Sequence, residues 1–275
     1  MLIDPTGRIV SLQQPAQRIV SLIPSLTETL FAIGAGKRLV GVSNYCIAPA
    51  NEVQLLPKVG GQKNPDFAKI AELTPDLLLL NREENRLSDY QRLAEKYPVY
   101  VSDVRRVSDV PDLLRDLGIL TDCYEAAGLL AKRTEDILAQ VSLLTRWIKP
   151  LRAITLIWHK PLMTTNGDTY LSDMMKRAGF VNPFFDCSVR YPEISIEDIR
   201  HATPDWILFP SEPHHWSPEE ISGIMQSLTE CHPEIRFHEI DGEAVTWYGA
   251  RTAVSLEKSI MEFVERIHQR GDTRK

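Results

Sequence analysis

The stretch RIVSLIPSLTETLFAIGAGKRLVGVS, residues 18–43, decides the fold because it reads as a strand, a helix and a second strand. Continuous apolar runs at 18–23 and 39–43 predict buried strands, and the apolar residues between them recur at helical spacing. A strand that follows a crossover helix lies parallel to the strand before it. The stretch therefore predicts the first unit of a parallel sheet that is covered by helices.

The same alternation continues on both sides of a long central segment. LTPDLLLL in the first half and ATPDWILF in the second half both place a Thr-Pro-Asp turn between a helix and a buried strand. Further strands are predicted at 76–80, 98–102, 153–158, 206–210 and 235–240. Repeated strand–helix units of this kind indicate α/β architecture with mostly parallel sheets.

The central segment has helical spacing without strands. Residues 121–147 contain no strong helix breaker, and we expect Gly118 to separate them from a shorter helix before them. A helix over 121–147 would be about 40 Å long at 1.5 Å per residue. The sequence thus predicts two α/β lobes bridged by one long α-helix, with boundaries at 1–120, 121–149 and 150–275.

Bulk composition excludes several classes of protein. The net charge of -6 argues against a nucleic-acid binder, which would carry a basic stripe. No apolar run approaches the roughly 20 residues needed to cross a bilayer. The four cysteines are far apart in the chain and form no CxxC pair, so we favour free thiols over two disulfides and expect no zinc knuckle.

Several motifs resemble those of a known family. RIVSLIPSLTE, ELTPDLLLLNREEN, KPLMTTNGDTYLSDMMKRAGFVNPF, FPSEP and DGEAVTWYGAR together span nearly the whole chain. They resemble the helical-backbone substrate-binding proteins of ABC importers, also called cluster A-II or class III. Within that family the chain looks most similar to the vitamin B12-binding proteins and to helical-backbone metal receptors that lack secretion signals.

The resemblance implies a fold and a function. The family fold is two Rossmann-like lobes joined by one helix, with the ligand in the cleft between them. It implies a monomer that captures a metal-bearing small molecule, cobalamin or a related corrinoid, and that can deliver it to an ABC permease. No intrinsic cofactor is expected. Alternatives are an iron siderophore, haem or a metal ion as ligand, or a metal- or corrinoid-handling protein without a permease, including, less favoured, a metalloenzyme.

The cellular location depends on the start of the chain. MLIDPTGRIV shows no charged start followed by an apolar stretch and a cleavage site. We expect a periplasmic or lipid-anchored protein if a leader was removed, and a cytoplasmic one if the sequence is complete.

Residues that follow predicted strands are the candidates for ligand contact, because ligands of open α/β sheets bind at the carboxyl ends of the strands. Tyrosine and tryptophan are frequent among them, which suits a large, flat, partly apolar ligand. The candidates are Tyr45, Asn81, Arg82, Glu83, Trp158, His159, Tyr191, Trp216, Trp247, Tyr248 and Arg251. By the resemblance, Tyr45, Tyr191 and Arg251 match B12-contacting positions, whereas Gly61 and Asn81 stand where those relatives carry tryptophans.

Two candidate metal ligands lie among these residues. Cys46 belongs to NYCIAP and offers a thiol at a strand end, and His159 follows another strand. Thiolate and imidazole both suit zinc, iron and cobalt. The alternative for Cys46 is a small buried hydrophobe. His214 and His215 are sequence neighbours, so their side chains are expected to point in different directions.

Permease docking in the B12 importers uses one glutamate on each lobe. The resemblance places the second-lobe glutamate at Glu197, whereas the first-lobe position is Ala68. Half of the docking pair is therefore missing from this chain.

Catalytic motifs are missing from the sequence. It contains no GxSxG elbow, P-loop, HExxH pair or GxGxxG after a strand. We therefore predict a binding protein and not an enzyme.

Overall fold

The computed structural model describes residues 1–146, 149–230 and 232–260, and these form two compact units. Unit 1 comprises Met1–Val104, Ser108–Asp136 and Tyr248–Ala253. Unit 2 comprises the described residues of Arg105–Val107 and Ile137–Trp247 and those that follow Ala253. The boundaries expected from the sequence do not anticipate that a segment near the end of the chain belongs to unit 1.

Unit 1 is built on a parallel four-stranded sheet in the order β4-β3-β7-β8. Its strands are β3 (Ile19–Ser21), β4 (Leu39–Val42), β7 (Leu77–Asn81) and β8 (Val99–Ser102). All five residues of β7 are buried, as expected for a central strand of a parallel sheet. The predicted strands of the first half are thus confirmed.

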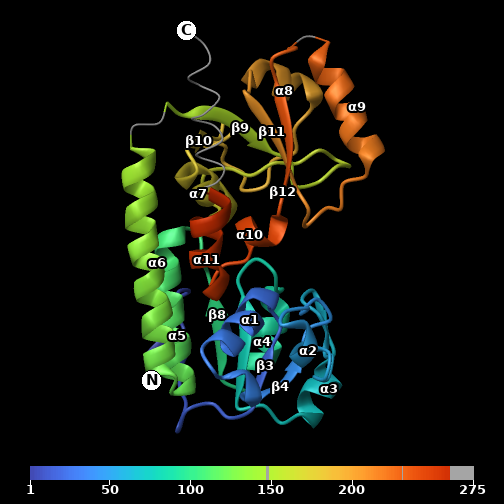
Figure 1. Cartoon of the computed structure of the whole chain (residues 1–275). Helices are drawn as coiled ribbons and strands as arrows, with labels where there is room; N and C mark the ends of the chain where they lie inside the picture. The colour runs from blue at the N-terminus through green and yellow to red at the C-terminus, as the bar shows by residue number, and fades with distance from the viewer. Residues whose placement is uncertain (147–148, 231, 261–275) are drawn as a thin grey trace. The chain divides into compact units, whose positions relative to one another are not determined.

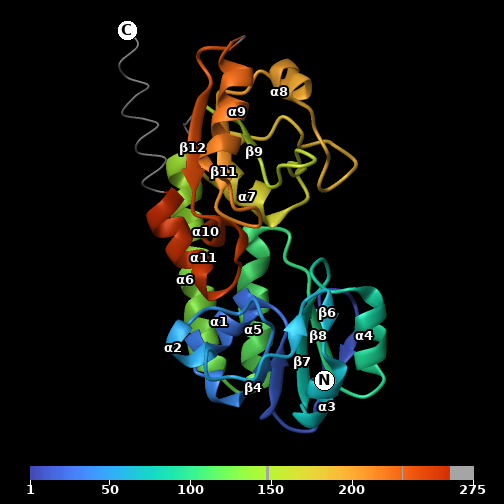
Figure 2. The same cartoon turned by 90° about the vertical axis from the view of Figure 1, so that its right-hand side faces the viewer.

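Short helices connect these strands, and the longer helices α5 and α6 follow β8 in the chain (Figures 1 and 2). In chain order, the helices from α1 to α6 are α1 (Pro24–Ala32), η1 (Gly36–Arg38), α2 (Ala50–Val53), α3 (Phe67–Glu72), α4 (Leu87–Ala94), η2 (Val107–Asp109), α5 (Val110–Thr121) and α6 (Tyr124–Thr145). Two small hairpins, β1 (Leu2–Ile3) with β2 (Ile9–Val10) and β5 (Gly60–Gly61) with β6 (Asn64–Pro65), were not expected. Strands of two residues leave no periodic signal in a sequence.

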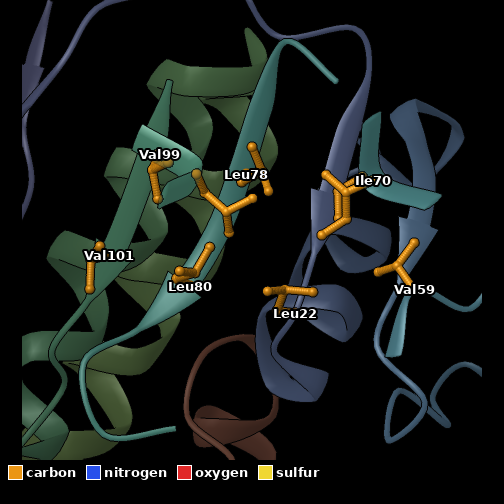
Figure 3. Packing of buried hydrophobic residues seen from close by; sticks show 9 residues of the cluster. Leu22, Val59, Ile70, Leu78, Leu80, Val99 and Val101 are labelled. Atoms are coloured by element: carbon orange, nitrogen blue, oxygen red, sulfur yellow. The ribbon is translucent and has the colours of Figure 1, made fainter. Parts of the chain in front are cut away.

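One hydrophobic core cluster of unit 1 brings together side chains of its sheet and of helices α3 and α4. Figure 3 shows Leu78, Leu80, Val99 and Val101 from neighbouring strands together with Ile70 of α3. These side chains are at most 6% exposed. Burying a Leu, Ile or Val side chain contributes about 1.5–3 kcal/mol.

The predicted long helix is α6, which the structure describes over 22 residues, or about 33 Å. Its predicted end at Trp147 lies outside the described residues. The division from α5 is at Asp122, which is left-handed with φ of 52°, and not at Gly118 as predicted. Gly118 instead lies inside α5, where an added Cβ would come within 2.7 Å of the Ala127 Cβ atom, so it allows α5 and α6 to approach closely.

Unit 2 repeats the architecture with a parallel sheet in the order β10-β9-β11-β12 (Figure 1). Its strands are β9 (Leu151–Thr155), β10 (Phe180–Val181), β11 (Trp206–Pro210) and β12 (Arg236–Ile240). Its helices are α7 (Tyr170–Arg177), α8 (Ile196–Ala202), α9 (Pro218–Thr229), α10 (Gly242–Thr246) and η3 (Leu256–Ile260). Helix α11 (Ala250–Ser255) is divided between the units, because its residues up to Ala253 belong to unit 1. The fold class predicted from the sequence, α/β with parallel sheets, is confirmed.

The Thr-Pro-Asp turns have the same structure in both units. Thr74 and Thr203 end their helices in the left-handed conformation, with φ of 44° and 43°. In unit 1 the Asp76 carboxylate accepts a hydrogen bond from the Arg18 backbone N–H at 2.9 Å. In unit 2 the Asp205 carboxylate accepts one from the Arg152 backbone N–H at 2.7 Å. Each turn therefore ties the start of one strand to the start of its neighbour.

A partly buried carboxyl in unit 1 predicts a pH-dependent stability. The Asp116 carboxylate accepts a hydrogen bond from the Tyr100 hydroxyl at 2.9 Å. Burial raises the pKa of Asp116 from 3.8 to about 6, although this hydrogen bond opposes the rise. The folded protein therefore holds this proton more tightly than the unfolded chain. The contribution of Asp116 to stability is full below pH 4 and is lost as the pH rises through about 6.

We expect the loss to be about 1 kcal/mol, because partial exposure screens the shift of about two units. Asp116→Asn should gain stability relative to the unmodified protein as the pH rises from 4 to 7, measured by urea unfolding at each pH. The control is Asp112→Asn, whose carboxylate on the same helix is 84% exposed. Equal pH dependence in the two variants would contradict the prediction.

Candidate functional site

The carboxyl ends of the unit 1 strands carry Tyr45, Cys46, Asn81 and Asp103, because β3, β4, β7 and β8 are parallel and end at one edge. Tyr45 is 58% exposed, which leaves its ring available to a ligand. Its ring lies beside Gly61, where an added Cβ would come within 3.2 Å of the Tyr45 Cε2 atom. Gly61 therefore makes room for the Tyr45 ring. By the resemblance, the vitamin B12-binding proteins carry a tryptophan at the position of Gly61.

Cys46 does not reach the surface at this edge. It is 1% exposed, and its Sγ atom lies 3.2 Å from both the Thr27 Oγ1 and the Ser43 Oγ atoms. Burial raises the pKa of the Cys46 thiol. The structure therefore places Cys46 as a buried thiol, which agrees with the interpretation of this residue as a small buried side chain.

Asn81 organises the turn after β7. Its Oδ1 atom accepts hydrogen bonds from the backbone N–H groups of Glu83 at 2.8 Å and Glu84 at 3.0 Å. Its Nδ2 atom donates to the Tyr248 hydroxyl at 2.8 Å and to the Ser102 carbonyl at 3.1 Å. The amide and the Tyr248 hydroxyl, both predicted to contact ligand, thus have protein partners, and both side chains are buried.

Arg251 is also held by the protein. Its guanidinium forms a bidentate ion pair with Glu28, at 2.8 Å and 3.0 Å. Both side chains are about one quarter exposed or less. This geometry fixes the guanidinium more firmly than a single contact would. Arg251 joins the segment Tyr248–Ala253 to α1.

A pocket of about 380 Å³ opens beside the turn after β7. Arg8, Arg82, Arg86 and Tyr90 contribute to its lining. Arg82 pairs with Asp103 at 2.8 Å, and the Arg8 guanidinium lies 3.9 Å from the centroid of the Tyr90 ring. Three guanidinium groups around one pocket favour anionic groups. Glu83 does not line the pocket; its backbone carbonyl accepts a hydrogen bond from Lys63.

In unit 2 the loops after β9 and β11 bring aromatic rings and histidines together. These strands are parallel neighbours, so the residues after them meet at one edge of the sheet. Trp158 is 42% exposed, and its ring centroid lies 5.3 Å from that of His214. The ring centroids of His214 and Trp216 are 4.7 Å apart with an interplanar angle of 84°.

Glu220, at the start of α9, lies between two of these histidines. Its Oε1 atom is 2.7 Å from His159 Nδ1, and its Oε2 atom is 3.0 Å from His214 Nε2. Hydrogen bonds from the Ser217 backbone N–H and from His214 lower the pKa of Glu220 to about 2. His215 points elsewhere, toward the Ser211 carbonyl. Sequence reasoning missed Glu220 because only folding brings it to a histidine 61 residues away.

The remaining predicted residues of unit 2 differ in exposure. Tyr191 is partly exposed, with the Arg190 guanidinium 6.0 Å from its ring centroid. Trp247 is only 7% exposed, so its ring is largely buried within the protein. Glu197 on α8 is 61% exposed and lies 3.2 Å from Arg200 and 3.5 Å from His201.

The described strand ends of the two units thus carry exposed aromatic and charged side chains. In the described part of the chain, Cys46, Cys123 and Cys187 are free thiols. A search of the described residues for helices long and apolar enough to cross a membrane finds none.

Comparison with known proteins agrees with this description. The chain is 29% identical over 203 residues to the vitamin B12-binding protein of Vibrio cholerae serotype O1, covering 72% of this chain and 71% of the relative. It is 26% identical over 264 residues to that of Vibrio vulnificus, covering 92% and 93%.

Solved structures share the fold. The periplasmic vitamin B12 binding protein BtuF of Vibrio cholerae aligns with a TM-score of 0.78 at 23% identity, over 91% of this chain and 97% of that one. The periplasmic heme-binding protein RhuT from Roseiflexus sp. RS-1 aligns with a TM-score of 0.77 at 22% identity, over 91% and 98%.

The model of the periplasmic binding protein family matches residues 19–226, which is most of both units. Members of this family bind solutes and are not enzymes, as the sequence motifs led us to expect. The chain is therefore a substrate-binding protein of the periplasmic binding protein family.

Proposed function

We propose that this protein captures cobalamin or a related corrinoid and serves as the solute-binding component of an ABC-type importer. The observation that carries the proposal is an exposed aromatic ring at the strand ends of each unit, Tyr45 in unit 1 and Trp158 in unit 2. The similarity to vitamin B12-binding proteins over nearly the full chain supports it. A corrinoid is a broad, flat macrocycle with apolar faces, which aromatic side chains can cover.

The proposal gives different roles to the predicted residues. Tyr45, Trp158 and Tyr191 contact the macrocycle, because their rings are at least partly exposed. Arg82 and His159 supply polar contacts at its edge. The other predicted residues mainly position the side chains that contact the ligand; they are Asn81, Glu83, Trp216, Trp247, Tyr248 and Arg251.

An iron chelate or haem is the second candidate ligand. The pocket lined by Arg8, Arg82 and Arg86 favours it, because haem and many siderophores carry negative charge. The fold shared with a heme-binding protein is compatible with this candidate. The amides around the cobalamin ring are neutral, so three guanidinium groups match that ring less well than they match an anionic ligand.

The proposed partner is an ABC permease, and the proposed location is the periplasm or the outer face of the membrane. Glu197 is the proposed docking residue on unit 2, because its side chain is 61% exposed. On unit 1 the resemblance places the docking position at Ala68, which has no carboxylate. Asp66, two residues earlier, is not free for this role, because its carboxylate caps α3 by accepting hydrogen bonds from the backbone N–H groups of Ala68 and Lys69, each at 3.1 Å. We propose a monomer as the binding species.

The proposal is tested by titrating the protein with cobalamin while tryptophan fluorescence and heat of binding are recorded. We expect micromolar or tighter binding, weakened about tenfold by Tyr45→Ala and by Trp158→Ala, since each removes about 1–2 kcal/mol of ring contact. Tyr124→Ala is the matched control, because Tyr124 is 55% exposed but lies at the start of α6.

Haem and an iron siderophore are titrated in parallel. Absence of cobalamin binding at high micromolar concentration would overturn the corrinoid proposal. Binding of haem instead, weakened by Arg82→Ala, would establish the second candidate. Equal losses of cobalamin affinity for Tyr45→Ala and Tyr124→Ala would show that the aromatic residues at the strand ends do not form the binding site.

A further inference from the structure

His159, His214 and Glu220 are the residues of unit 2 whose side chains converge most closely on one point. One potential ligand atom from each lies within 4.8 Å of the others. His159 comes from the loop after β9, His214 from the loop after β11, and Glu220 from the first turn of α9. Within the described part of the chain, they form the one group of three such side chains that could hold a metal ion.

We propose that His159, His214 and Glu220 form a binding site for a divalent transition-metal ion of the zinc class. Two imidazoles and one carboxylate are a recurring donor set for zinc, and imidazole also suits cobalt, nickel and copper. Three protein ligands leave a fourth coordination position for water or for a donor atom of another molecule. The proposal does not depend on which solute the protein captures.

The carboxylate is held in place by its own helix. Ser217 and Glu220 form a capping box, in which the Ser217 backbone N–H donates to Glu220 Oε2 at 3.0 Å and Ser217 Oγ accepts from the Glu220 backbone N–H at 3.2 Å. A ligand oriented by a hydrogen bond from outside the site loses less freedom when the metal binds. These contacts leave both oxygens of the carboxylate facing a histidine nitrogen.

Aromatic side chains fix the two imidazoles. The Trp216 ring contacts His214 edge to face at 4.7 Å and lies 5.9 Å from His159. Trp158 lies 5.3 Å from His214. The two histidine side chains are 19% and 20% exposed, so a metal ion could enter from solvent while much of its surroundings stayed apolar. A hydrophobic surrounding strengthens the attraction between the cation and its ligands.

Small movements of the side chains would bring the ligand atoms to the spacing that a metal ion requires. Ligand atoms about 2.0–2.1 Å from a tetrahedral zinc ion lie about 3.3 Å from one another. Each carboxylate oxygen now faces a different imidazole nitrogen, at 2.7 and 3.0 Å, and one ligand atom from each of the three side chains lies within 4.8 Å of the others, so the three would have to draw together by up to about 1.5 Å. Each ring would present the lone pair of the nitrogen that now faces Glu220 and carry its proton on the other nitrogen.

The charge of the loaded site predicts its fourth ligand. Two neutral imidazoles and one carboxylate carry a charge of -1, so a divalent ion leaves a net charge of about +1. An anionic donor, such as hydroxide or a carboxylate, is favoured at the open position. The site could thus bind a solute that carries such a group directly to the metal.

The test is a titration of the chelator-treated full chain with Co²⁺, whose visible absorption reports its coordination, followed by competition with Zn²⁺. We expect one equivalent to bind, with quenching of tryptophan fluorescence because Trp158 and Trp216 border the site. Zn²⁺ should displace the Co²⁺ and raise the melting temperature.

Glu220→Gln is the main variant, because glutamine at this position can still complete the capping box and keep α9 folded. We expect it and His214→Ala to weaken Zn²⁺ binding by more than the 10–100-fold loss typical of removing an outer partner. The matched control is His201→Ala, since His201 also lies beside a glutamate, at 3.5 Å, but is 76% exposed. It should bind Zn²⁺ like the unmodified protein.

Two results would overturn the proposal. One is failure of Co²⁺ and Zn²⁺ to bind at millimolar concentration. The other is equal affinity in the unmodified protein, Glu220→Gln and His214→Ala, which would assign any binding to other side chains. In both cases Glu220 would be a helix-capping residue whose carboxylate is hydrogen-bonded to two imidazoles. None of these measurements involves cobalamin, so their outcome is separate from that of the corrinoid proposal.

Discussion

Gly249→Ala is expected to destabilise unit 1 by about 3–5 kcal/mol. Gly249 has a φ of 110°, a conformation that residues with a Cβ atom rarely adopt. An added Cβ would come within 2.1 Å of the Thr29 Oγ1 atom. That hydroxyl cannot simply rotate away, because it donates to the Ser25 carbonyl at 2.7 Å and accepts from the Ala250 backbone N–H at 3.1 Å. Backbone strain and a steric clash therefore add.

The measurement is urea unfolding, with Gly128→Ala as the matched control. Gly128 lies inside α6, and an added Cβ there would meet no atom within 4 Å. Alanine has a higher helix propensity than glycine, so this control should be about 1 kcal/mol more stable than the unmodified protein. The same chemical change is thus expected to have opposite signs at the two positions. A cost below 1 kcal/mol for Gly249→Ala would show that the segment can move aside.

Asn81→Ala is expected to cost about 2–4 kcal/mol. The substitution removes five hydrogen bonds, to the backbone N–H groups of Glu83 and Glu84, the Ser102 carbonyl and hydroxyl, and the Tyr248 hydroxyl. Asn81 is 5% exposed and Tyr248 is 9% exposed, so water cannot readily replace the lost partners. A buried polar group without a partner costs about 1–3 kcal/mol.

A double-mutant cycle isolates the contact between the two side chains. Tyr248→Phe removes the hydroxyl, and the coupling between Asn81→Ala and Tyr248→Phe should be about 0.5–1.5 kcal/mol. Asn51→Ala, at an exposed position in α2, is the control and should change stability by less than about 0.5 kcal/mol. Additive effects of the two substitutions would contradict a direct contact. If Asn81→Ala destabilises the protein by this amount and also weakens ligand binding, the weaker binding is attributed to the loss of stability and not to a lost contact with the ligand.

Local sequence patterns predicted the strands of both sheets except β10, whose two residues leave no periodic signal. LLLL in β7 and the apolar run of β3 are long enough to identify buried, central strands of a parallel sheet. The Thr-Pro-Asp turns were visible because each concentrates a helix end and a strand start in a few residues. The break between α5 and α6 was misplaced because an aspartate adopted the left-handed conformation, which sequence alone assigns more readily to glycine.

The candidate site was predictable only in part. The sequence placed Tyr45 and Trp158 at strand ends, and both are exposed in the structure. It could not predict that Arg251 pairs with Glu28, because those residues are 223 positions apart. The histidines were considered singly for the same reason: their common partner Glu220 reads as an ordinary charged residue at the start of a helix.

The return of Tyr248–Ala253 to unit 1 has a consequence for biosynthesis. A ribosome releases the amino-terminal end of a protein first, and domains made of one continuous segment can fold as soon as they emerge. Unit 1 cannot complete its contacts in this way, because partners of Thr29, Glu28 and Asn81 follow the second sheet in the chain. These side chains therefore lack those partners while the second sheet is translated. The last contacts of unit 1 form only after the second sheet has been made, although the sheet of unit 1 is made first.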